Sequence, residues 1–299
     1  MDLNTIDAVV APRGRRDLPA WRAGDAWLAG GTWLFSEPQP ALRRLVDLAS
    51  LGWPAHAVTA QGLAIGATCT IAALDRLDLP AEWTASPLVG QCCRALLGSF
   101  KVWNAATVGG NLCMALPAGP MTALAAALEG TCVIWTPDGG ERGLGVLDFV
   151  RGPQETALRP GEVLRRIDLP ARALARRTAF RRISLSPEGR SGALLIGTRD
   201  PAGGWALTVT AATRRPVRLA LADAPDAAGL RAALAAAIPD ALWYDDVHGR
   251  PDWRRHVTGL LAEEIRAELG QGARAEPGRE NRAEPDDRPR AGPGRGLPA

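Results

Sequence analysis

With 299 residues, of which 46% are hydrophobic, the chain is long enough for one large or two ordinary globular domains. Its net charge of +3 comes almost wholly from arginines interspersed with acids, which argues against a nucleic-acid-binding stripe. No stretch reaches the ~18 uninterrupted apolar residues of a membrane helix. Because residues 1–10 also lack a signal-peptide pattern, we expect a cytoplasmic protein that binds neither nucleic acid nor membrane.

The residue types that ligate metals are few and poorly spaced. Five cysteines make an odd number with no C-x-x-C, and three histidines form no H-x-x-x-H. Such spacing supplies neither an iron–sulfur cluster nor a zinc site. We therefore predict no protein-held metal, and reduced, buried thiols. The residues are Cys69, Cys92, Cys93, Cys113, Cys132, His56, His248 and His256.

Residues 1–170 alternate between apolar runs and Gly/Pro turns, which is typical of an α+β layer structure. An amphipathic, arginine-containing stretch precedes Trp27. Thr70 is suited to capping a helix that begins at Ile71. The pattern predicts strands at 26–29, 62–67, 131–136 and 162–169, a helical turn at 41–46 running into a strand at 47–48, and helices at 71–74, 87–97 and 121–128.

After residue 176 the pattern changes to longer segments with period-2 alternation, which predicts an antiparallel sheet. The expected strands are 178–184, 192–198 and 205–210, and two helices follow at 227–238 and 252–269. We predict one domain at 1–172 and a second at 173–270. Residues 271–299 have almost no large apolar side chains, so we predict a disordered tail.

Two glycine-rich segments, 28–32 and 106–111, each place paired glycines at the end of an apolar run, followed by Thr32 or Asn111. Glycine enters positive φ at little steric cost, so consecutive N–H groups can point at one anionic oxygen. A single glycine pair is more often a tight turn, but two in one domain predict a clamp for a phosphate-bearing dinucleotide. No G-x-G-x-x-G or G-x-x-x-x-G-K-[ST] occurs, which excludes Rossmann and P-loop sites.

The motifs in order resemble the flavoprotein subunit of molybdenum hydroxylases, the xanthine dehydrogenase and aerobic carbon monoxide dehydrogenase type. They cover residues 27–170 closely and 176–269 more loosely. The matching residues are Ala29-Gly30-Gly31-Thr32-x-Leu34, Ile65-Gly66-Ala67-x-x-Thr70-Ile71, Asn104-x-Ala106-Thr107-Val108-Gly109-Gly110-Asn111 with Pro117-Ala118, Phe149-x-x-Gly152, Thr156-x-Leu158-x-Pro160-Gly161-Glu162 and Ile167-x-Leu169-Pro170.

The resemblance implies a two-lobed FAD-binding domain of the vanillyl-alcohol-oxidase/xanthine dehydrogenase type, followed by a small α/β domain with an antiparallel sheet. FAD would lie with its pyrophosphate on 28–34 and on the turn 107–111. Leu158 would lie near the isoalloxazine, as would Arg181 or Arg182 after Phe180. The implied cofactor-binding residues are Leu28, Ala29, Gly30, Gly31, Thr32, Trp33, Leu34, Thr107, Gly109, Gly110, Asn111 and Leu158.

Two positions depart from the family pattern. Trp33 stands where the family usually has a polar or acidic residue, and Pro120 stands where it has an aspartate that helps hold the cofactor. These departures bear on the affinity for FAD. The Trp33 indole offers a stacking face for flavin or adenine, although a tryptophan more often serves packing.

The function that the resemblance implies is electron transfer in a hetero-oligomer. A molybdopterin-binding large subunit would oxidise the substrate, an iron–sulfur subunit or domain would pass on the electrons, and FAD would deliver them to NAD⁺ or another acceptor. No side chain of this chain is then expected to be a catalytic acid or base. Two alternatives stay open: a structural subunit that has lost FAD, and a free-standing flavin reductase or oxidase of related fold.

Overall fold

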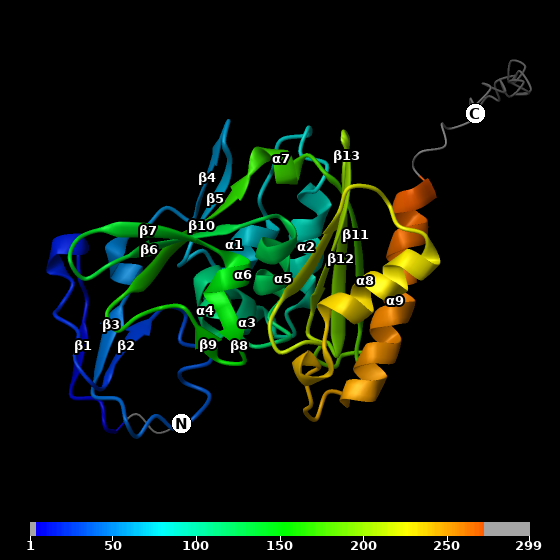
Figure 1. Ribbon diagram of the computed structural model, residues 1–299. Helices are drawn as coiled ribbons and strands as arrows, with labels where there is room; N and C mark the ends of the chain where they lie inside the picture. The colour runs from blue at the N-terminus through cyan, green and yellow to red at the C-terminus, as the bar shows by residue number, and fades with distance from the viewer. Residues whose placement is uncertain (1–3, 272–299) are drawn as a thin grey trace, which may run out of the picture.

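The computed structural model describes residues 4–271, so the tail predicted for 271–299 falls outside the described residues apart from position 271. Figure 1 shows a five-stranded sheet, a group of helices, a four-stranded sheet and two outer helices, stacked in that order. A small three-stranded sheet stands at the N-terminal side. The predicted α+β class is confirmed. Within 4–271 no helix is both long and apolar enough to cross a bilayer.

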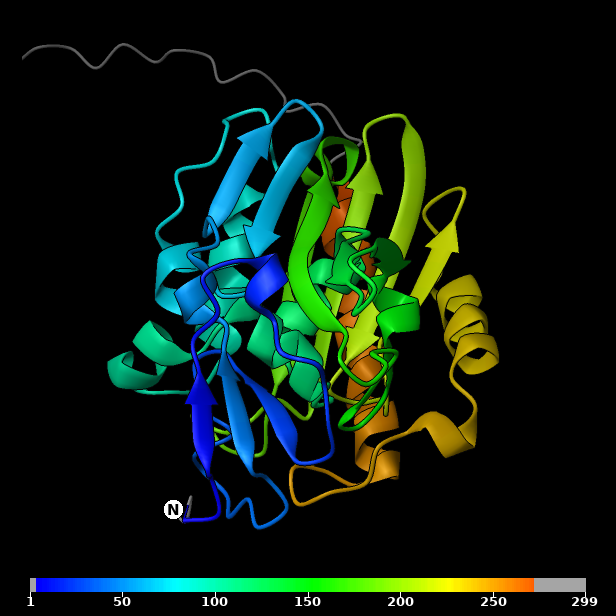
Figure 2. The same cartoon turned by 90° about the vertical axis from the view of Figure 1, so that its left-hand side faces the viewer.

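The N-terminal lobe is a parallel sheet in the order β1-β3-β2, seen in blue at the lower front of Figure 2. Its strands are β1 (Ala8–Val10), β2 (Asp25–Leu28) and β3 (Arg44–Asp47). Two 3₁₀ turns accompany them, η1 (Arg15–Asp17) and η2 (Ala49–Leu51). The strand predicted at 26–29 is β2. The predicted helical turn at 41–46 is wrong for 44–46, which belong to β3.

The middle sheet is antiparallel in the order β4-β5-β10-β6-β7. The predicted strands match β5 (Gly62–Gly66), β6 (Thr131–Trp135) and β10 (Val163–Pro170). The prediction missed both edge strands, β4 (His56–Thr59) and β7 (Glu141–Gly145). Every residue of β4 is exposed, so no apolar alternation marks it. A short hairpin, β8 (Val150–Gly152) and β9 (Glu155–Thr156), follows β7.

Seven short helices belong to this middle part, and a group of them lies between the two large sheets (Figure 1). Helices α2 and α5 agree with the predicted helices, and Thr70 caps α1 as expected, since its Oγ1 accepts the Ala73 N–H at 3.2 Å. All eight residues of α5 are buried. The helices are α1 (Ile71–Asp75), α2 (Ser86–Ala95), α3 (Phe100–Ala105), α4 (Val108–Met114), α5 (Pro120–Ala127), α6 (Val146–Phe149) and α7 (Ala171–Leu174).

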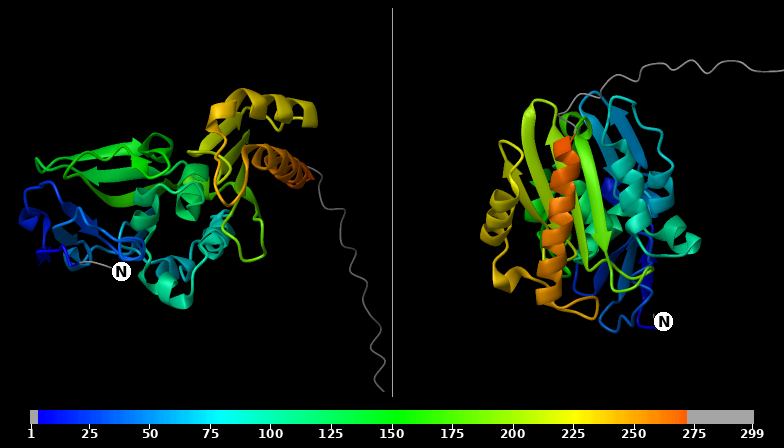
Figure 3. Two further views of the ribbon diagram at one scale, coloured as in Figure 1. Left: turned by 90° about the horizontal axis from the view of Figure 1, so that it is seen from below. Right: turned by 90° about the vertical axis from the view of Figure 1, so that its right-hand side faces the viewer.

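The C-terminal part is an antiparallel sheet in the order β11-β12-β13-β14. One face packs on the middle helices and the other on α9, as Figure 3 shows. Along β12, Leu194 and Ile196 join the main core, whereas Leu195 joins a second core with α9. The prediction missed β14. The elements are β11 (Arg177–Ile183), β12 (Ala193–Asp200), β13 (Gly203–Thr210), β14 (Val217–Leu221), α8 (Ala227–Ala237), η3 (Asp240–Leu242) and α9 (Pro251–Gln271).

Glu129, just after α5, ties the helical layer to the four-stranded sheet. Its carboxylate accepts hydrogen bonds from Arg172 at 2.5 Å, Arg176 at 2.7 Å and Arg218 at 2.8 Å. Burial alone would raise the pKa of Glu129, but the hydrogen bond from Arg176 and the charges of all three arginines hold it below its ordinary value. This network fixes Glu129 in a left-handed conformation, φ 56°, that a long side chain rarely adopts.

Candidate functional site

The first glycine pair lies where β2 ends, and it packs directly on the backbone that leads to the second pair. A Cβ on Gly30 would lie 1.8 Å from the Ala105 carbonyl oxygen, so only glycine fits there. Gly31 has φ +67°, and a Cβ on it would lie 2.5 Å from the Phe35 ring. The fold therefore brings the two predicted glycine segments together, although they are far apart in the sequence.

The first segment presents a row of unused backbone donors. None of the N–H groups of residues 29–34 donates a hydrogen bond to another group of the described chain. The turn is closed instead by later residues, since Phe35 N donates to Gly31 O at 2.8 Å and Ser36 N to Trp33 O at 2.9 Å. Within 29–34, all residues except the exposed Thr32 are half-buried. Half-buried donors without partners need water or a ligand as their acceptor.

The second glycine pair differs, because it forms the first turn of α4 instead of a loop. Its N–H groups are occupied: Gly109 N donates to Ala67 O at 2.9 Å, and the neighbouring Val108 N donates to Cys69 O at 2.9 Å. A Cβ on Gly109 would lie 2.5 Å from the Ala67 Cβ. Glycine is thus required at 109 for the helix to pack on the segment that follows β5.

Thr107 completes this arrangement as the N-cap of α4. Its Oγ1 accepts the Gly110 N–H at 3.0 Å, and its carbonyl accepts the Asn111 N–H at 3.0 Å. The Asn111 Oδ1 accepts the Met121 N–H at 3.1 Å, so that side chain closes the start of α5. The expectation that the N–H groups of this pair point at an anionic oxygen is wrong, because Ala67 O and Thr107 Oγ1 already accept them. The Asn111 amide nitrogen keeps no partner within the described chain.

Leu158 lies in a loop that is bound to the N-terminal lobe by a hydrogen bond from Trp27. The sequence analysis did not predict this bond. Its side chain is half-buried at the edge of the main core. The Trp27 indole N–H donates to the Glu162 carbonyl at 2.9 Å, which joins this loop to the strand just before the first glycine pair. The Pro160-Gly161-Glu162 motif is the sequence signal that marks the loop. Glu162 is 2% exposed, an unusual burial for an acid.

Two buried ion pairs hold the flanks of the site. Arg142 bonds both oxygens of Glu162, at 2.8 and 2.6 Å, and holds the pKa of that carboxyl below its usual range. Arg44 likewise bonds Asp25, at 2.8 and 2.5 Å, and lowers its pKa. Asp25 and Arg44 begin neighbouring strands in register. Removal of one partner would leave a buried charge unpaired, which is costly. These pairs therefore fix the lobe that carries the first glycine pair.

The structure also shows where the two departures from the family pattern, Trp33 and Pro120, and the two arginines expected near the flavin lie. Trp33 is half-buried in the first segment, and Pro120 is buried as the first residue of α5. Arg181 forms ion pairs with Glu264 and Glu268 on α9, so it faces away from the main core and the expectation of a cofactor contact is wrong for it. Arg182 remains on the other face of β11 and donates to Gly189 O at 3.1 Å.

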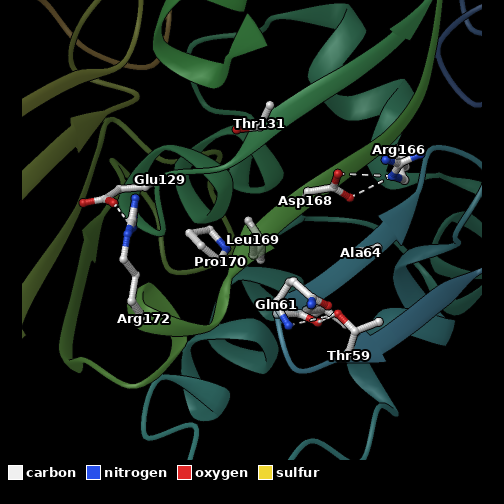
Figure 4. Close-up of a pocket in the computed structure, with 12 residues that line it drawn as sticks. Thr59, Gln61, Ala64, Glu129, Thr131, Arg166, Asp168, Leu169, Pro170 and Arg172 are labelled. Carbon is white, nitrogen blue, oxygen red and sulfur yellow. Dashed lines mark hydrogen bonds and ion pairs between the residues drawn. The ribbon is translucent and has the colours of Figure 1, made fainter. Parts of the chain in front are cut away.

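A cavity of about 380 Å³ lies elsewhere, over strands β5, β6 and β10, and Figure 4 shows it. None of the predicted site residues lines it. Its charged side chains already pair with one another, Arg166 with Asp168 and Arg172 with Glu129. Residues 4–271 also contain no group of three or more His, Cys, Asp or Glu side chains placed to hold a metal ion. The glycine segments therefore stay the candidate site.

Comparisons with known proteins show the family and the fold of the chain. A curated relative, the glyceraldehyde dehydrogenase medium chain of Sulfolobus acidocaldarius, is 34% identical over 84 residues, 28% of this chain and 29% of the relative. The match thus spans less than a third of the length of that relative. Among solved structures, quinoline 2-oxidoreductase from Pseudomonas putida 86 has a TM-score of 0.75 at 20% identity, covering 91% of this chain and 99% of that chain.

A carbon monoxide dehydrogenase from Oligotropha carboxidovorans has the same fold, with a TM-score of 0.75 at 22% identity, covering 89% of this chain and 99% of that chain. Residues 22–172 match the model of a family described as the FAD binding domain in molybdopterin dehydrogenase. That range includes both glycine segments and the Leu158 loop. The chain belongs to the family of the FAD binding domain in molybdopterin dehydrogenase.

Proposed function

We propose that the chain binds FAD, with the pyrophosphate on the first glycine segment, and serves as the electron-transfer subunit of a molybdopterin-dependent dehydrogenase. The observation that carries this proposal is the row of backbone N–H groups at 29–34, which have no acceptor within the described residues and lie in a half-buried loop that packs on the backbone at Ala105. Consecutive N–H groups of this kind bind phosphate oxygens. Family membership supports FAD as the cofactor.

The site residues then have distinct tasks. The N–H groups of Ala29 to Leu34 hold the pyrophosphate, with the exposed Thr32 hydroxyl as one further donor. Gly109 and Thr107 keep the first turn of α4 in place, and the Asn111 amide nitrogen, which has no partner within the described chain, is available to the ligand as a donor. Leu158 and Trp33 supply apolar surface for the flavin or the adenine.

Bound FAD would supply the redox chemistry, accepting electrons from one carrier and passing them to another. The side chains of this protein hold it, orient it and keep water away, and none acts as a general acid or base. Since the cysteine spacing provides no cluster, an iron–sulfur subunit and a molybdopterin-binding large subunit complete the complex. NAD⁺ or another acceptor takes up the electrons.

We also propose that the cofactor domain comprises residues 1–172 and that a second domain comprises 173–270. The separate hydrophobic core between β11–β14 and the helices α8 and α9 supports this boundary. Leu194, Ile196 and Ala211 nevertheless reach the main core, so the two domains share an extensive apolar interface. The second domain thus forms one wall of the layer that contains α4 and α5.

The test is an absorption titration of the purified chain with FAD. We expect flavin bands at one FAD per chain, and about a tenfold loss of affinity in Gly31→Ala, because the added Cβ strains the left-handed turn and meets the Phe35 ring. Gly52→Ala is the matched control, since Gly52 has a similar φ of +60° and an added Cβ there meets nothing within 4 Å. Its FAD affinity should equal that of the wild type.

A chain that takes up no FAD under any condition would overturn the proposal. It would favour the alternative of a structural subunit that has kept the glycine segments as architecture, an outcome toward which the occupied N–H groups of the second pair point. NADH-dependent turnover by this chain without partners would instead favour a free-standing flavin reductase or oxidase.

A further inference from the structure

Arg254, on the first turns of α9, is the largest fully buried side chain of the described residues, with 1% exposed. Its guanidinium reaches four acceptors. The Nε donates to Gly249 O at 2.8 Å, Nη1 donates to Gly192 O at 2.7 Å and to Ala211 O, and Nη2 bonds the Asp246 carboxylate. Three of these acceptors are backbone carbonyls from separate segments. Only the planar fork of arginine serves all of them at once.

One of those segments, at Ala211, is strained. Ala211 follows β13 with φ 63°, in the left-handed region that alanine seldom adopts. It is fully buried. Its carbonyl accepts from Arg254, and its N–H donates to the Pro117 carbonyl at 2.7 Å. Ala211 thus connects a buried arginine of the C-terminal part to the segment between α4 and α5.

That segment, residues 115–119, is held at a second carbonyl by another strained residue. Gln154, with φ 59°, donates its N–H to Ala115 O at 3.2 Å, and Ala115 itself has φ 48°. Three of the four non-glycine residues with positive φ in the described chain therefore meet here. Strain of this kind persists only where the surroundings impose it, and it gathers at functional sites.

The same segment borders the candidate cofactor site. A Cβ on Gly119 would lie 3.0 Å from Asn111 Oδ1, the atom that accepts the Met121 N–H. Leu116, Pro117 and Ala118 are only half-buried, so the segment has a free side. A displacement of Pro117 would therefore reach Asn111 and the start of α5 without passing through the core.

Resting on the proposed function, we propose that Arg254 is a positioning residue for the FAD site, which fixes residues 115–119 beside Asn111 by holding Ala211 in its left-handed conformation. The position of residues 115–119 beside the FAD site would then be determined by α9, a helix from the other end of the chain. Lysine cannot replace arginine in this task, because a single ammonium group cannot reach acceptors on three segments together.

The experiment compares Arg254→Lys with Arg255→Lys in the full chain. Arg255 is the next residue of α9, 54% exposed and paired with Asp240, so its substitution keeps the helix and the charge. FAD affinity and the visible circular dichroism of the bound flavin are measured at a temperature where far-UV circular dichroism shows each variant folded. We expect about a tenfold weaker FAD affinity and an altered flavin signal for Arg254→Lys alone.

A folded Arg254→Lys with wild-type FAD affinity and flavin signal would overturn the inference, because a merely structural role lowers only the melting temperature. If Arg254→Lys does not fold, Asp246→Asn decides: it keeps an acceptor for Nη2 but loses the charge, and a change in the flavin signal supports the inference whereas an unchanged one overturns it. A wild-type chain without FAD binding would overturn the proposed function as well. The two failures are therefore distinct.

Discussion

The two glycine pairs of this chain look alike in sequence and do different work. At the first pair, Gly31 is left-handed and the surrounding N–H groups have no acceptor in the described chain. At the second pair, Gly110 is helical and its N–H is consumed by the Thr107 cap. A pair of glycines followed by a polar residue therefore marks either a loop whose N–H groups lack acceptors in the described chain or a tightly packed helix start. The partner of each N–H tells the two apart.

The leading glycine of each pair allows a close steric approach, and here the two regions agree. Gly30 lets the first segment lie on the Ala105 carbonyl, and Gly109 lets α4 lie on Ala67. Both contacts are with backbone or with a short side chain, which cannot move aside. The difference between the pairs is therefore concentrated in their second glycines, Gly31 and Gly110, and four substitutions test it.

The largest effect is expected for Gly30→Ala. Its Cβ would lie 1.8 Å from the Ala105 carbonyl oxygen, so the first segment must lift from the second. We expect the free energy of unfolding to fall by about 3 kcal/mol, with FAD binding lost because the row of donors is displaced. Urea unfolding and an FAD titration measure the two effects. A variant that keeps both wild-type values would show that the segments do not pack as described.

The next effect concerns the lobe under the first pair. Replacing Asp25 by Asn removes the buried charge that Arg44 bonds, and we expect a loss of about 2 kcal/mol at neutral pH. Because Arg44 holds the pKa of Asp25 below the ordinary value of an aspartate, the stabilisation is present above that ordinary value and is lost as the pH falls through the lower, folded pKa.

The advantage of the wild type over Asp25→Asn should therefore shrink between pH 4 and the acid transition, as urea midpoints at a series of pH values would show. Asp47→Asn is the control from the same sheet, since among the described residues that carboxylate accepts only the nearby Ala49 N–H, at 2.9 Å on the surface. A constant difference in unfolding free energy between wild type and Asp25→Asn across the acid range would mean that the charge of Asp25 does not contribute to stability.

The sequence predicted the elements whose apolar patterns are strong, such as α5, β10 and β12. It missed β4, because an exposed edge strand has no buried face to mark it. It also mistook the surroundings of the second glycine pair, although Thr107 followed by a helical run is a capping signal. The residues before it, 100–105, form the helix α3 although none of them is buried, so no buried face marks that helix in the sequence.

Contacts between residues far apart in the sequence could not be predicted from local sequence patterns. The hydrogen bond from Trp27 to Glu162 joins residues 135 positions apart, and nothing near either residue announces it. The four acceptors of Arg254 lie on three segments, so its role is visible only in the folded chain. Family motifs, in contrast, placed both glycine segments in one site because they carry information about packing that periodicity lacks.

A smaller effect is expected for Thr107→Val, which keeps the shape of the side chain but removes the cap. The Gly110 N–H then loses its acceptor, and we expect a loss of about 1 kcal/mol in unfolding free energy. If the second pair only packs, FAD should stabilise this variant as much as it stabilises the wild type, as melting temperatures with and without FAD would show. A larger FAD-induced shift would mean that the freed N–H takes a phosphate oxygen.

The smallest effect is expected for Gly110→Ala. An added Cβ would meet only Thr107 Oγ1, at 2.9 Å, and this tight contact opposes the gain of roughly 0.5–1 kcal/mol from the better helix propensity of alanine. Stability should therefore change by less than about 0.5 kcal/mol, and FAD affinity by less than about threefold. Comparing the FAD affinity of this variant with that of Gly31→Ala tests the difference between the two glycine pairs. If both variants lose FAD equally, the second pair also holds the pyrophosphate and the two pairs do not differ in function. If only Gly31→Ala loses FAD, the same two-glycine motif serves binding at the first site and packing at the second.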